Sequence, residues 1–374
     1  MCLQAVIAID PELTAAREAL ADVYEETGRV FEAGQQRELA YMKNWCIIDR
    51  AQSPAAEATL LLAVYKAGGQ IRTSHLLPIE RFTKIRYMLD YARPDKQFEL
   101  PAHDVVLNMQ GDPDWLAADD HRLAELARRS GRPVLNAPRA AWLTRRDLLP
   151  ERLTNIEGID VPAVHRIEPA QARSLGVVGE LARRNATYPL LVRSARTHGG
   201  DSVVLASQPS DLAQAELPAK NVVYATEYRD YRSLDGYYRK YRVMFIDRCL
   251  YPYHLAISKR WLVHYFSAEM AAEPWKLDEE YRFLKDPVGV LGPKAWRALE
   301  QIAERLDLDY AGIDFSILPE GTVLVFEANA TMFVHPEEAG GVLSYKNQAV
   351  DAIVRAFGEM ILRHRGPASA RSPC

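Results

Sequence analysis

The most restrictive feature of the sequence is a pair of apolar runs, YAGIDFSIL and TVLVFEAN, joined by the short stretch PEG. These runs predict two adjacent antiparallel strands with a tight turn between them. Side chains two residues apart share a face of a strand, so Glu327 and Asn329 would stand together, opposite Asp314. Mg²⁺ prefers such carboxylate and carboxamide oxygens. The hairpin therefore predicts a magnesium site, although a solvated polar face can carry the same pattern.

The composition is that of an ordinary globular protein. A chain of 374 residues predicts two or three domains. A net charge of −4 gives no reason to expect nucleic acid or a membrane surface as partner, and the apolar runs are too short to span a bilayer. The N-terminus lacks the basic segment of a signal peptide. Four scattered cysteines predict neither a zinc site nor a disulfide framework, so we expect a cytoplasmic protein with reduced thiols.

Residues 14–40 predict two short antiparallel helices, TAAREALADVYEETG and RVFEAGQQRELA. The spacing of small and large residues resembles one tetratricopeptide repeat, and an ordinary helical hairpin explains it as well. A single repeat cannot bury its own apolar face. We therefore expect residues 1–41 to pack on a neighbour through Leu20, Tyr24 and Phe31, and to serve a protein partner or substrate presentation.

Residues 45–145 predict a scaffold domain of the α/β class. Expected strands at NWCIID, DVVLNM and VLNAP alternate with expected helices at SPAAEATLLLAVYKAGG and DDHRLAELARRSGRP, the second closed by Gly131. This alternation predicts a parallel, doubly wound sheet. The stretch GDPD after the second strand lacks the G-x-G-x-x-G fingerprint of dinucleotide binding, so we expect at most a substrate edge there.

Residues 146–366 are richer in strands, and positive charge gathers at two of them. Arg193 ends the strand YPLLVRSA, and a loop with Gly199 and Gly200 follows, whose backbone N–H groups could meet a phosphate. In YRKYR, alternation places Lys240 and Arg242 on one face, where they favour an anion. Basic edge strands and glycine hairpins give the same patterns. The tail, residues 367–374, is expected to be disordered.

The ordered series YPLLVR, THGGDS, ATEYRD, DGYYRKYRV, GIDFSIL and FEANATM resembles the ATP-grasp superfamily of carboxylate–amine ligases. This superfamily includes D-alanine–D-alanine ligase, glutathione synthetase and the ribosomal-protein glutamate ligase. The resemblance covers residues 45–365. It implies an ATP-grasp domain after a doubly wound pre-grasp domain. The implied activity is ATP- and Mg²⁺-dependent joining of a carboxylate to an amine through an acylphosphate.

The resemblance also implies roles for single residues. Asp314, Glu327 and Asn329 would hold Mg²⁺ between the ATP phosphates. Arg193 stands where the family usually has a lysine on those phosphates, and Arg146 in LTRRDLL falls near an earlier phosphate-binding cation. The loop THGGDS would close over the phosphates.

The remaining implied roles concern the nucleotide and the reacting carbon. Glu227 and Tyr228 match the hinge whose backbone reads adenine, and Asp235 would bind the ribose hydroxyls. Lys240 would assist at the phosphates. Arg242 would stabilise the oxyanion of the tetrahedral intermediate.

Two other functions fit the same residues. Some ATP-grasp relatives transfer a phosphoryl group without ligation, and the chain could instead be a nucleotide-binding interaction module. The expected substrates are a small carboxylate and an amine, or a peptide. In the aromatic segment 251–270, His254, Trp261 and His264 could line the acceptor site, and an aromatic core explains them equally well.

Overall fold

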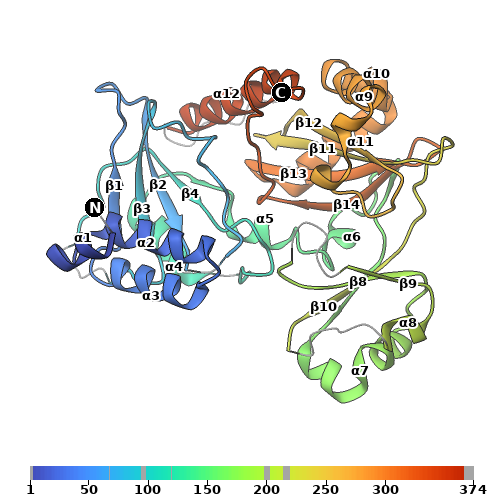
Figure 1. Cartoon of the computed structure of the whole chain (residues 1–374), viewed down its shortest axis with the longest axis horizontal. Helices are drawn as coiled ribbons and strands as arrows, with labels where there is room; N and C mark the ends of the chain where they lie inside the picture. Colours follow the sequence, from blue (N-terminus) through green and yellow to red (C-terminus); the bar gives the residue numbers. More distant parts are fainter. Residues whose placement is uncertain are drawn as a thin grey trace.

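The computed structural model describes residues 3–66, 68–93, 98–118, 120–197, 203–213 and 220–365. The expected disordered tail, 367–374, lies outside these ranges. Three sheets form three regions of the molecule, and helices cover them (Figure 1). The predicted α/β class is confirmed. In the described part of the chain, no helix combines the length and the apolar character needed to cross a bilayer.

The N-terminal region consists of helices α1 (Leu3–Ile9), α2 (Thr14–Glu26) and α3 (Val30–Tyr41). The predicted antiparallel pair within residues 14–40 is confirmed. Leu20 is buried as predicted, but Phe31 is 75% exposed, so its predicted packing on a neighbour is wrong. The inner face of α3 is formed by Ala33 and Ala40, seven residues apart, and Phe31 falls outside that stripe.

The first sheet has the order β1-β3-β2-β4-β5. Its strands are β1 (Cys46–Asp49), β2 (Ala58–Val64), β3 (Phe82–Met88), β4 (Val105–Asn108) and β5 (Val134–Leu135). Only the β1–β3 pair is antiparallel. The crossover from β4 to β5 is α4 (His121–Ser130), which ends at Gly131 with φ 61°, as predicted.

The helix predicted over SPAAEATLLLAVYKAGG is wrong, because its apolar run forms the central strand β2. Leu60 and Leu62 face one apolar cluster, whereas Leu61 and Ala63 face another. A strand buried on both faces reads as a continuous apolar run, which has no period to separate it from a buried helix. The sheet is therefore only partly built from alternating strands and helices.

A small antiparallel sheet follows, with the order β7-β10-β8-β9. Its strands are β7 (Val164–Ile167), β8 (Leu190–Ser194), β9 (Val204–Ala206) and β10 (Val223–Glu227). It lies with α7 (Pro169–Arg183) and α8 (Pro209–Ala213) at the lower right of Figure 1. Short helices α5 (Pro138–Trp142) and α6 (Leu149–Arg152) connect it to the first sheet.

The third sheet has the order β12-β11-β13-β14-β6. Its strands are β6 (Ile159–Asp160), β11 (Tyr238–Ile246), β12 (Cys249–Ser258), β13 (Tyr310–Ile317) and β14 (Val323–Asn329). On β11, Val243 and Phe245 pack with helix α11 (Pro293–Leu306). The same cluster includes residues of α9 (Pro274–Lys285) and α10 (Pro287–Leu291).

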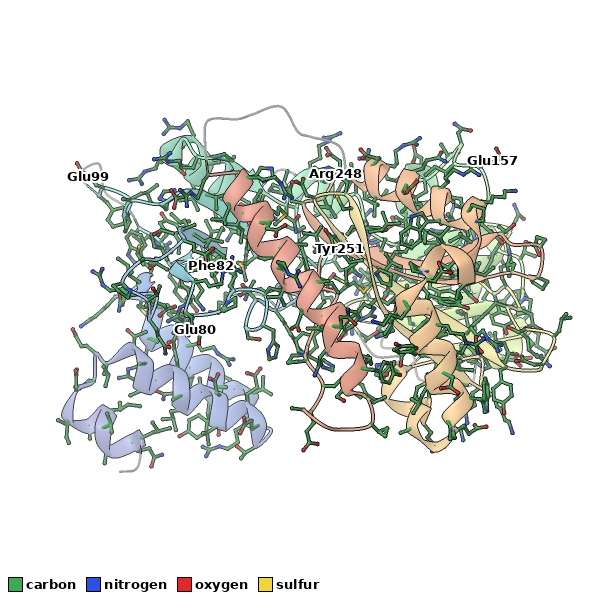
Figure 2. All side chains as sticks on the ribbon, turned by 90° about the horizontal axis from the view of Figure 1, so that it is seen from above. Glu80, Phe82, Glu99, Glu157, Arg248 and Tyr251 are labelled. Atoms are coloured by element: carbon green, nitrogen blue, oxygen red, sulfur yellow. The ribbon has the colours of Figure 1, made fainter. Side chains whose placement is uncertain are left out.

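The last helix, α12 (Asn347–Arg363), joins the first and third sheets. Its buried residues Ile353 and Phe357 share one apolar cluster with Leu60 of β2 and Met244 of β11. Figure 2 shows α12 between Phe82 on one side and Tyr251 on the other. The N-terminal sheet and the third sheet are therefore held in a fixed relation by a common core.

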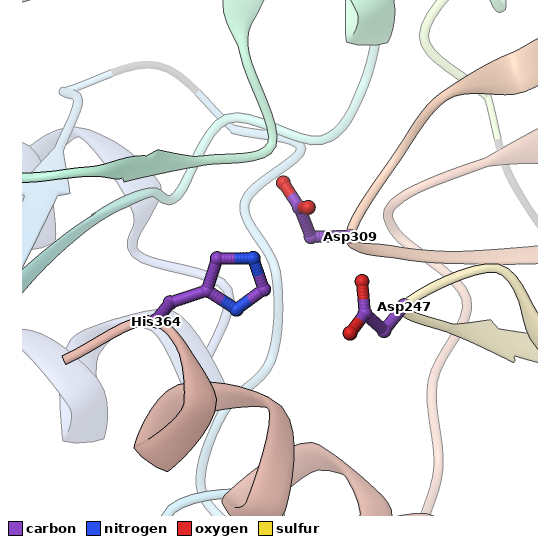
Figure 3. A group of neighbouring side chains, drawn as sticks. All are labelled: Asp247, Asp309 and His364. Carbon is purple, nitrogen blue, oxygen red and sulfur yellow. The ribbon is translucent and has the colours of Figure 1, made fainter. Parts of the chain in front are cut away.

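Polar contacts fix the same junction. Asp247, Asp309 and His364 lie together where the β11–β12 turn, the start of β13 and the end of α12 meet (Figure 3). Arg248 bonds both aspartates, at 2.9 and 3.1 Å, and Arg363 bonds Asp247 at 2.9 Å. Two arginines already balance these carboxylates, so the group acts as an ion-pair cluster that fixes three elements.

Among the described residues, Cys46 has a free, half-buried thiol, and burial raises its pKa.

Asn136 offers a test of the junction between the first and third sheets. Its side chain exchanges two hydrogen bonds with the backbone of Tyr310, at 2.8 and 2.9 Å, and its own N–H donates to Asp309 at 2.7 Å. Asn136→Ala leaves both backbone groups of Tyr310 buried without these partners. We expect the free energy of unfolding, measured by urea denaturation, to fall by about 2–5 kcal/mol.

Asn185→Ala is the matched control. Asn185 has the same left-handed backbone, φ 54°, but its side chain is exposed. The control therefore carries the backbone cost alone, about 1–2 kcal/mol. Equal losses in the two variants would show that the Asn136 side chain does not hold the sheets together.

Candidate active site

The predicted metal hairpin is formed by β13 and β14. Asp314 lies directly opposite Glu327 in the antiparallel register, and Asn329 lies opposite Gly312. The side chains of Asp314 and Glu327 line one cavity, and those of Glu327 and Asn329 line a second. The three side chains therefore share one face, as alternation predicts. The side-chain oxygen Oδ1 of Asn329 accepts two hydrogen bonds from Thr331, one from the hydroxyl at 2.7 Å and one from the backbone N–H at 2.9 Å, and these bonds orient the carboxamide.

Two cations from β11 hold Asp314. Arg242 donates to both carboxylate oxygens, at 2.5 and 2.8 Å, and Lys240 Nζ lies 3.1 Å from one of them. Burial opposes ionisation of Asp314, but the charges of Arg242 and Lys240 outweigh it and keep its pKa well below the usual range. The predicted common face of Lys240 and Arg242 is confirmed. Arg239 lies on the other face and bonds Asp235 and Glu279.

Glu327 receives the charge of a more distant segment. Arg146, between α5 and α6, forms an ion pair with it. Burial works to raise the pKa of Glu327, but the charges of Arg146, Arg193 and Lys240 together outweigh burial and lower the pKa. Nearby, Arg193 at the end of β8 donates to the Thr197 hydroxyl at 3.1 Å. Burial and the neighbouring Arg146 lower the pKa of Arg193 to about 10. Two adjacent arginines of this kind favour an anion between them.

The smaller of two adjoining cavities, about 160 Å³, lies between the second and third sheets. Glu227 and Tyr228 of the predicted hinge line it, and Tyr228 meets the ring of Trp261 edge-on at 6.1 Å. Its other walls are largely apolar and include Leu191, Tyr231, Leu324 and Phe326. The cavity therefore suits a flat group with few polar atoms.

Asp235 is not brought to either cavity. Its carboxylate is bound by Arg239, at 2.7 and 3.1 Å, and it does not line the described walls of the cavities around the hairpin. The expectation that it binds ribose is therefore not supported by its position. The ion pair between Asp235 and Arg239, four residues apart, keeps the Asp235 side chain on the face of the sheet opposite Lys240.

The larger cavity has a volume of about 720 Å³ and shares Arg146, Lys240 and Glu327 with the smaller one. Its described walls carry six cationic side chains and a single carboxylate, Glu327; the cations are Arg72, Arg146, Arg193, Lys240, Arg242 and Lys346. Such an excess of positive charge favours a polyanion.

Two of these cations, Arg72 and Lys346, are not predicted from the sequence. Arg72 follows β2 in the N-terminal domain, and Lys346 precedes α12. Nothing in their local sequence signals a site, because this cavity forms only where distant segments of the chain meet. Lys346 is 1% exposed, bonds Glu337 at 2.5 Å and lies 3.9 Å from the ring centre of Tyr265.

The aromatic segment 251–270 contributes to both cavities. His254 and His264 line the larger one, and Trp261 lines the smaller one. His254 is 5% exposed and stacks on Tyr265 at 4.7 Å. Burial and the charge of Arg242 lower its pKa well below the usual value, so the ring is neutral. Buried Glu280 fixes this wall by accepting bonds from Leu255 N, Tyr265 Oη and Tyr345 Oη, at 3.0, 3.0 and 2.6 Å.

Gly199 and Gly200 of the predicted glycine loop lie outside the described residues. The segment before it meets the N-terminal domain. The Arg196 guanidinium lies 3.7 Å from the ring centre of Trp115, and Arg196 also bonds the Asp114 carbonyl. Gly111 lies in the loop that carries Asp114 and Trp115, between β4 and α4. A Cβ on Gly111 would stand 2.8 Å from the carbonyl carbon of Ala330. The stretch GDPD therefore packs directly against the end of the β13–β14 hairpin.

Comparison with protein-family models and with curated proteins finds no match. Solved structures do match. A RimK-domain ATP-grasp protein from Sphaerobacter thermophilus is 16% identical, with 82% of this chain and 100% of that one covered at a TM-score of 0.45. D-alanine–D-alanine ligase from Bacillus anthracis, complexed with ATP, is 14% identical, with 83% and 97% covered at 0.47. Carboxyaminoimidazole ribonucleotide synthase from Aspergillus clavatus, also with ATP, is 13% identical, with 80% and 77% covered at 0.44. At such TM-scores, the function has to be argued from the site itself.

The ion pairs of the site give a prediction about stability. Asp314→Asn leaves Arg242 buried without its counter-charge, and we expect the free energy of unfolding at pH 7 to fall by about 3–5 kcal/mol. Asp314 has a lowered pKa in the folded state, so its contribution is present above about pH 4 and is lost as the pH falls further. The gap between wild type and variant should therefore narrow below about pH 4.

Asp235→Asn is the control, because this aspartate is also bonded twice by an arginine but its side chain is 46% exposed. Asp235→Asn should lower the free energy of unfolding by at most about 1 kcal/mol. Urea denaturation of both variants between pH 3 and pH 7 measures the difference. A cost for Asp314→Asn no larger than that of the control would contradict the buried ion pair.

Proposed function

We propose that the protein is an ATP- and Mg²⁺-dependent carboxylate–amine ligase. The observation that carries the proposal is the meeting of two unlike cavities at Glu327 and Lys240. One is small and largely apolar, and the other is large and strongly cationic. A nucleotide has the matching division, with a flat base at one end and a polyphosphate at the other. The motif series that resembles the ATP-grasp ligases supports the same assignment.

The base of the nucleotide fits the smaller cavity. Tyr228 and Trp261 supply aromatic walls. The N–H groups of Glu227 and Tyr228 already donate to the carbonyls of Ala163 and Pro189, so the backbone there would meet the base through carbonyl oxygens at the end of β10. The phosphates would then extend past Lys240 toward Arg146 and Arg193. This path uses the cations whose charges repel one another in the protein alone, which a polyphosphate would relieve.

The hairpin fits a hard divalent cation in the chemistry of its ligands. Asp314, Glu327 and Asn329 present oxygen atoms on one face. The carboxylates are already balanced by Arg242, Lys240 and Arg146. A cation alone would add to an existing positive excess, so we expect Mg²⁺ to bind together with the nucleotide. When bound, Mg²⁺ would neutralise charge on the transferring phosphoryl group.

The chain's own residues would position two successive reactions. Arg146, Arg193 and Lys240 would hold the phosphates while a substrate carboxylate oxygen bonds to the γ-phosphorus and the bond to ADP breaks. Arg242, fixed through Nε and Nη2 to Asp314, would direct Nη1 at the oxyanion that forms when an amine attacks the acylphosphate. The new C–N bond forms, the C–O bond to phosphate breaks, and the amine loses a proton.

Two alternatives remain distinct from ligation. A phosphotransferase would release ADP and keep the phosphoryl group on its product, and a binding module would bind ATP without turnover. Incubation with ATP and Mg²⁺ against pools of amino acids and small acids, with mass spectrometry of the products, separates the three. We expect ADP release that requires both an acid and an amine. The product should have the summed mass of the acid and the amine less one water. ADP release without an amine would favour the phosphotransferase.

Arg242→Lys provides the sharper test of mechanism. The substitution keeps the positive charge but removes the planar guanidinium with its paired N–H donors. We therefore expect turnover to fall by about 100- to 1000-fold while ATP affinity changes little. Calorimetry gives the affinity, and a coupled ADP assay gives the turnover.

Arg239→Lys is the matched control on the same strand, because its side chain bonds Asp235 and Glu279 on the other face. Its turnover should stay near that of the wild type. Weaker ATP binding with unchanged maximal turnover in Arg242→Lys would instead assign Arg242 to holding the nucleotide.

Further roles stay predictions. The N-terminal helices are proposed to serve a protein partner or substrate presentation. Asp314→Ala and Glu327→Ala are proposed to abolish ATP-dependent turnover.

A further inference from the structure

The outer part of the larger cavity is lined by a cluster of rings. Phe333 and His335 lie 5.0 Å apart between their centres, and Phe266 stacks on His335 at 6.2 Å with an interplanar angle of 17°. His264 lies 5.5 Å from Phe266. All four side chains line the cavity, and Phe266 is 75% exposed. Apolar rings grouped along the wall of a cavity, one of them exposed, are typical of a ligand-binding surface.

Arg72 stands beside this ring cluster. Its guanidinium lies 5.1 Å from the ring centre of Phe333, and the residue is exposed. Within the described ranges, Arg72 has no carboxylate partner, whereas Arg146, Lys240, Arg242 and Lys346 are each paired with one. Arg72 is therefore a cation of the cavity wall that no carboxylate of the described residues neutralises.

We propose that the ring cluster and Arg72 bind an aromatic α-amino acid, with the carboxylate on Arg72 and the side chain against Phe266 and His335. This inference rests on the proposed function, in which the bound amino acid supplies the attacking amine. Arginine binds a carboxylate through two parallel bonds, and the rings favour a flat apolar group over an aliphatic one.

The location decides which carboxylate Arg72 would bind. The reacting carboxylate has to lie beside Arg242 and the metal hairpin, on β11 and β13. Arg72 comes from the N-terminal domain and is grouped with the rings, so it would bind a carboxylate that does not react. In the ligation step, the amine nitrogen bonds to the acyl carbon, phosphate leaves, and the amino acid's own carboxylate is unchanged.

The test uses the full chain with Mg²⁺ and ADP, which prevents turnover, and titrates amino acids by calorimetry. The probes are L-phenylalanine, L-tyrosine, L-tryptophan, L-alanine and phenethylamine, which lacks the carboxylate. We expect at least one aromatic amino acid to bind about 10-fold more tightly than L-alanine. Phenethylamine should bind about 10- to 100-fold more weakly than L-phenylalanine.

Variants identify the residues. Arg72→Gln should weaken binding of the aromatic amino acid by about 10- to 100-fold. Arg50→Gln is the matched control, since Arg50 is an exposed arginine of the same domain that does not line the cavity. Phe266→Leu keeps an apolar side chain but removes the ring, and it should weaken binding by a few-fold. Equal affinities for Arg72→Gln and Arg50→Gln, or no preference for aromatic amino acids over alanine, would overturn the proposal.

ADP release measured on the same samples with ATP separates this inference from the ligase proposal. If phenylalanine binds in a manner that depends on Arg72 but no ADP is released, the amino-acid site is supported and the ligase proposal is contradicted. ADP release that requires alanine or another aliphatic amine, with no response to aromatic amino acids, would keep the ligase and remove the aromatic site.

Discussion

The buried ion pair between Asp314 and Arg242 is the interaction on which the site depends. The two residues lie opposite each other on adjacent strands, and the arginine bonds both carboxylate oxygens. Lys240 adds a second positive charge to the same carboxylate. A pair buried to this degree gains little net stability, because both charges give up water. What it gains is geometry, since neither side chain can turn away without leaving an unpaired buried charge.

This geometry is completed by charges from elsewhere in the chain. Arg146 balances Glu327 from the connection between the first two sheets, and Arg193 approaches from β8. The result is a carboxylate pair already neutralised by arginine and lysine, with further positive charge around it. Such a centre is suited to a metal only when the metal arrives with a polyanion. The charge balance thus links the metal proposal to the nucleotide proposal.

The larger cavity also depends on how the first sheet and its loops are positioned against the third sheet. Helix α12 buries Ile353 and Phe357 in one core with β2 and β11, and Asn136 bonds the backbone of Tyr310. These contacts bring Arg72 to the wall of the larger cavity and Gly111 against Ala330. The domain that looks like a scaffold in the sequence therefore forms part of the wall where a second substrate would bind.

The sequence by itself determined the local features whose signals are local. Alternation placed Lys240 beside Arg242 and Glu327 beside Asn329, and the glycine at 131 ended α4, because a strand's faces and a helix's end depend on neighbouring residues alone. The run TLLLAVY had no such signal, since a strand covered on both faces and a buried helix share one apolar pattern. Tertiary structure alone decided that this run is β2 and that Arg72 lines the cavity. Each of these depends on which distant segment packs alongside, and the spacing of residues along the chain carries no information about that.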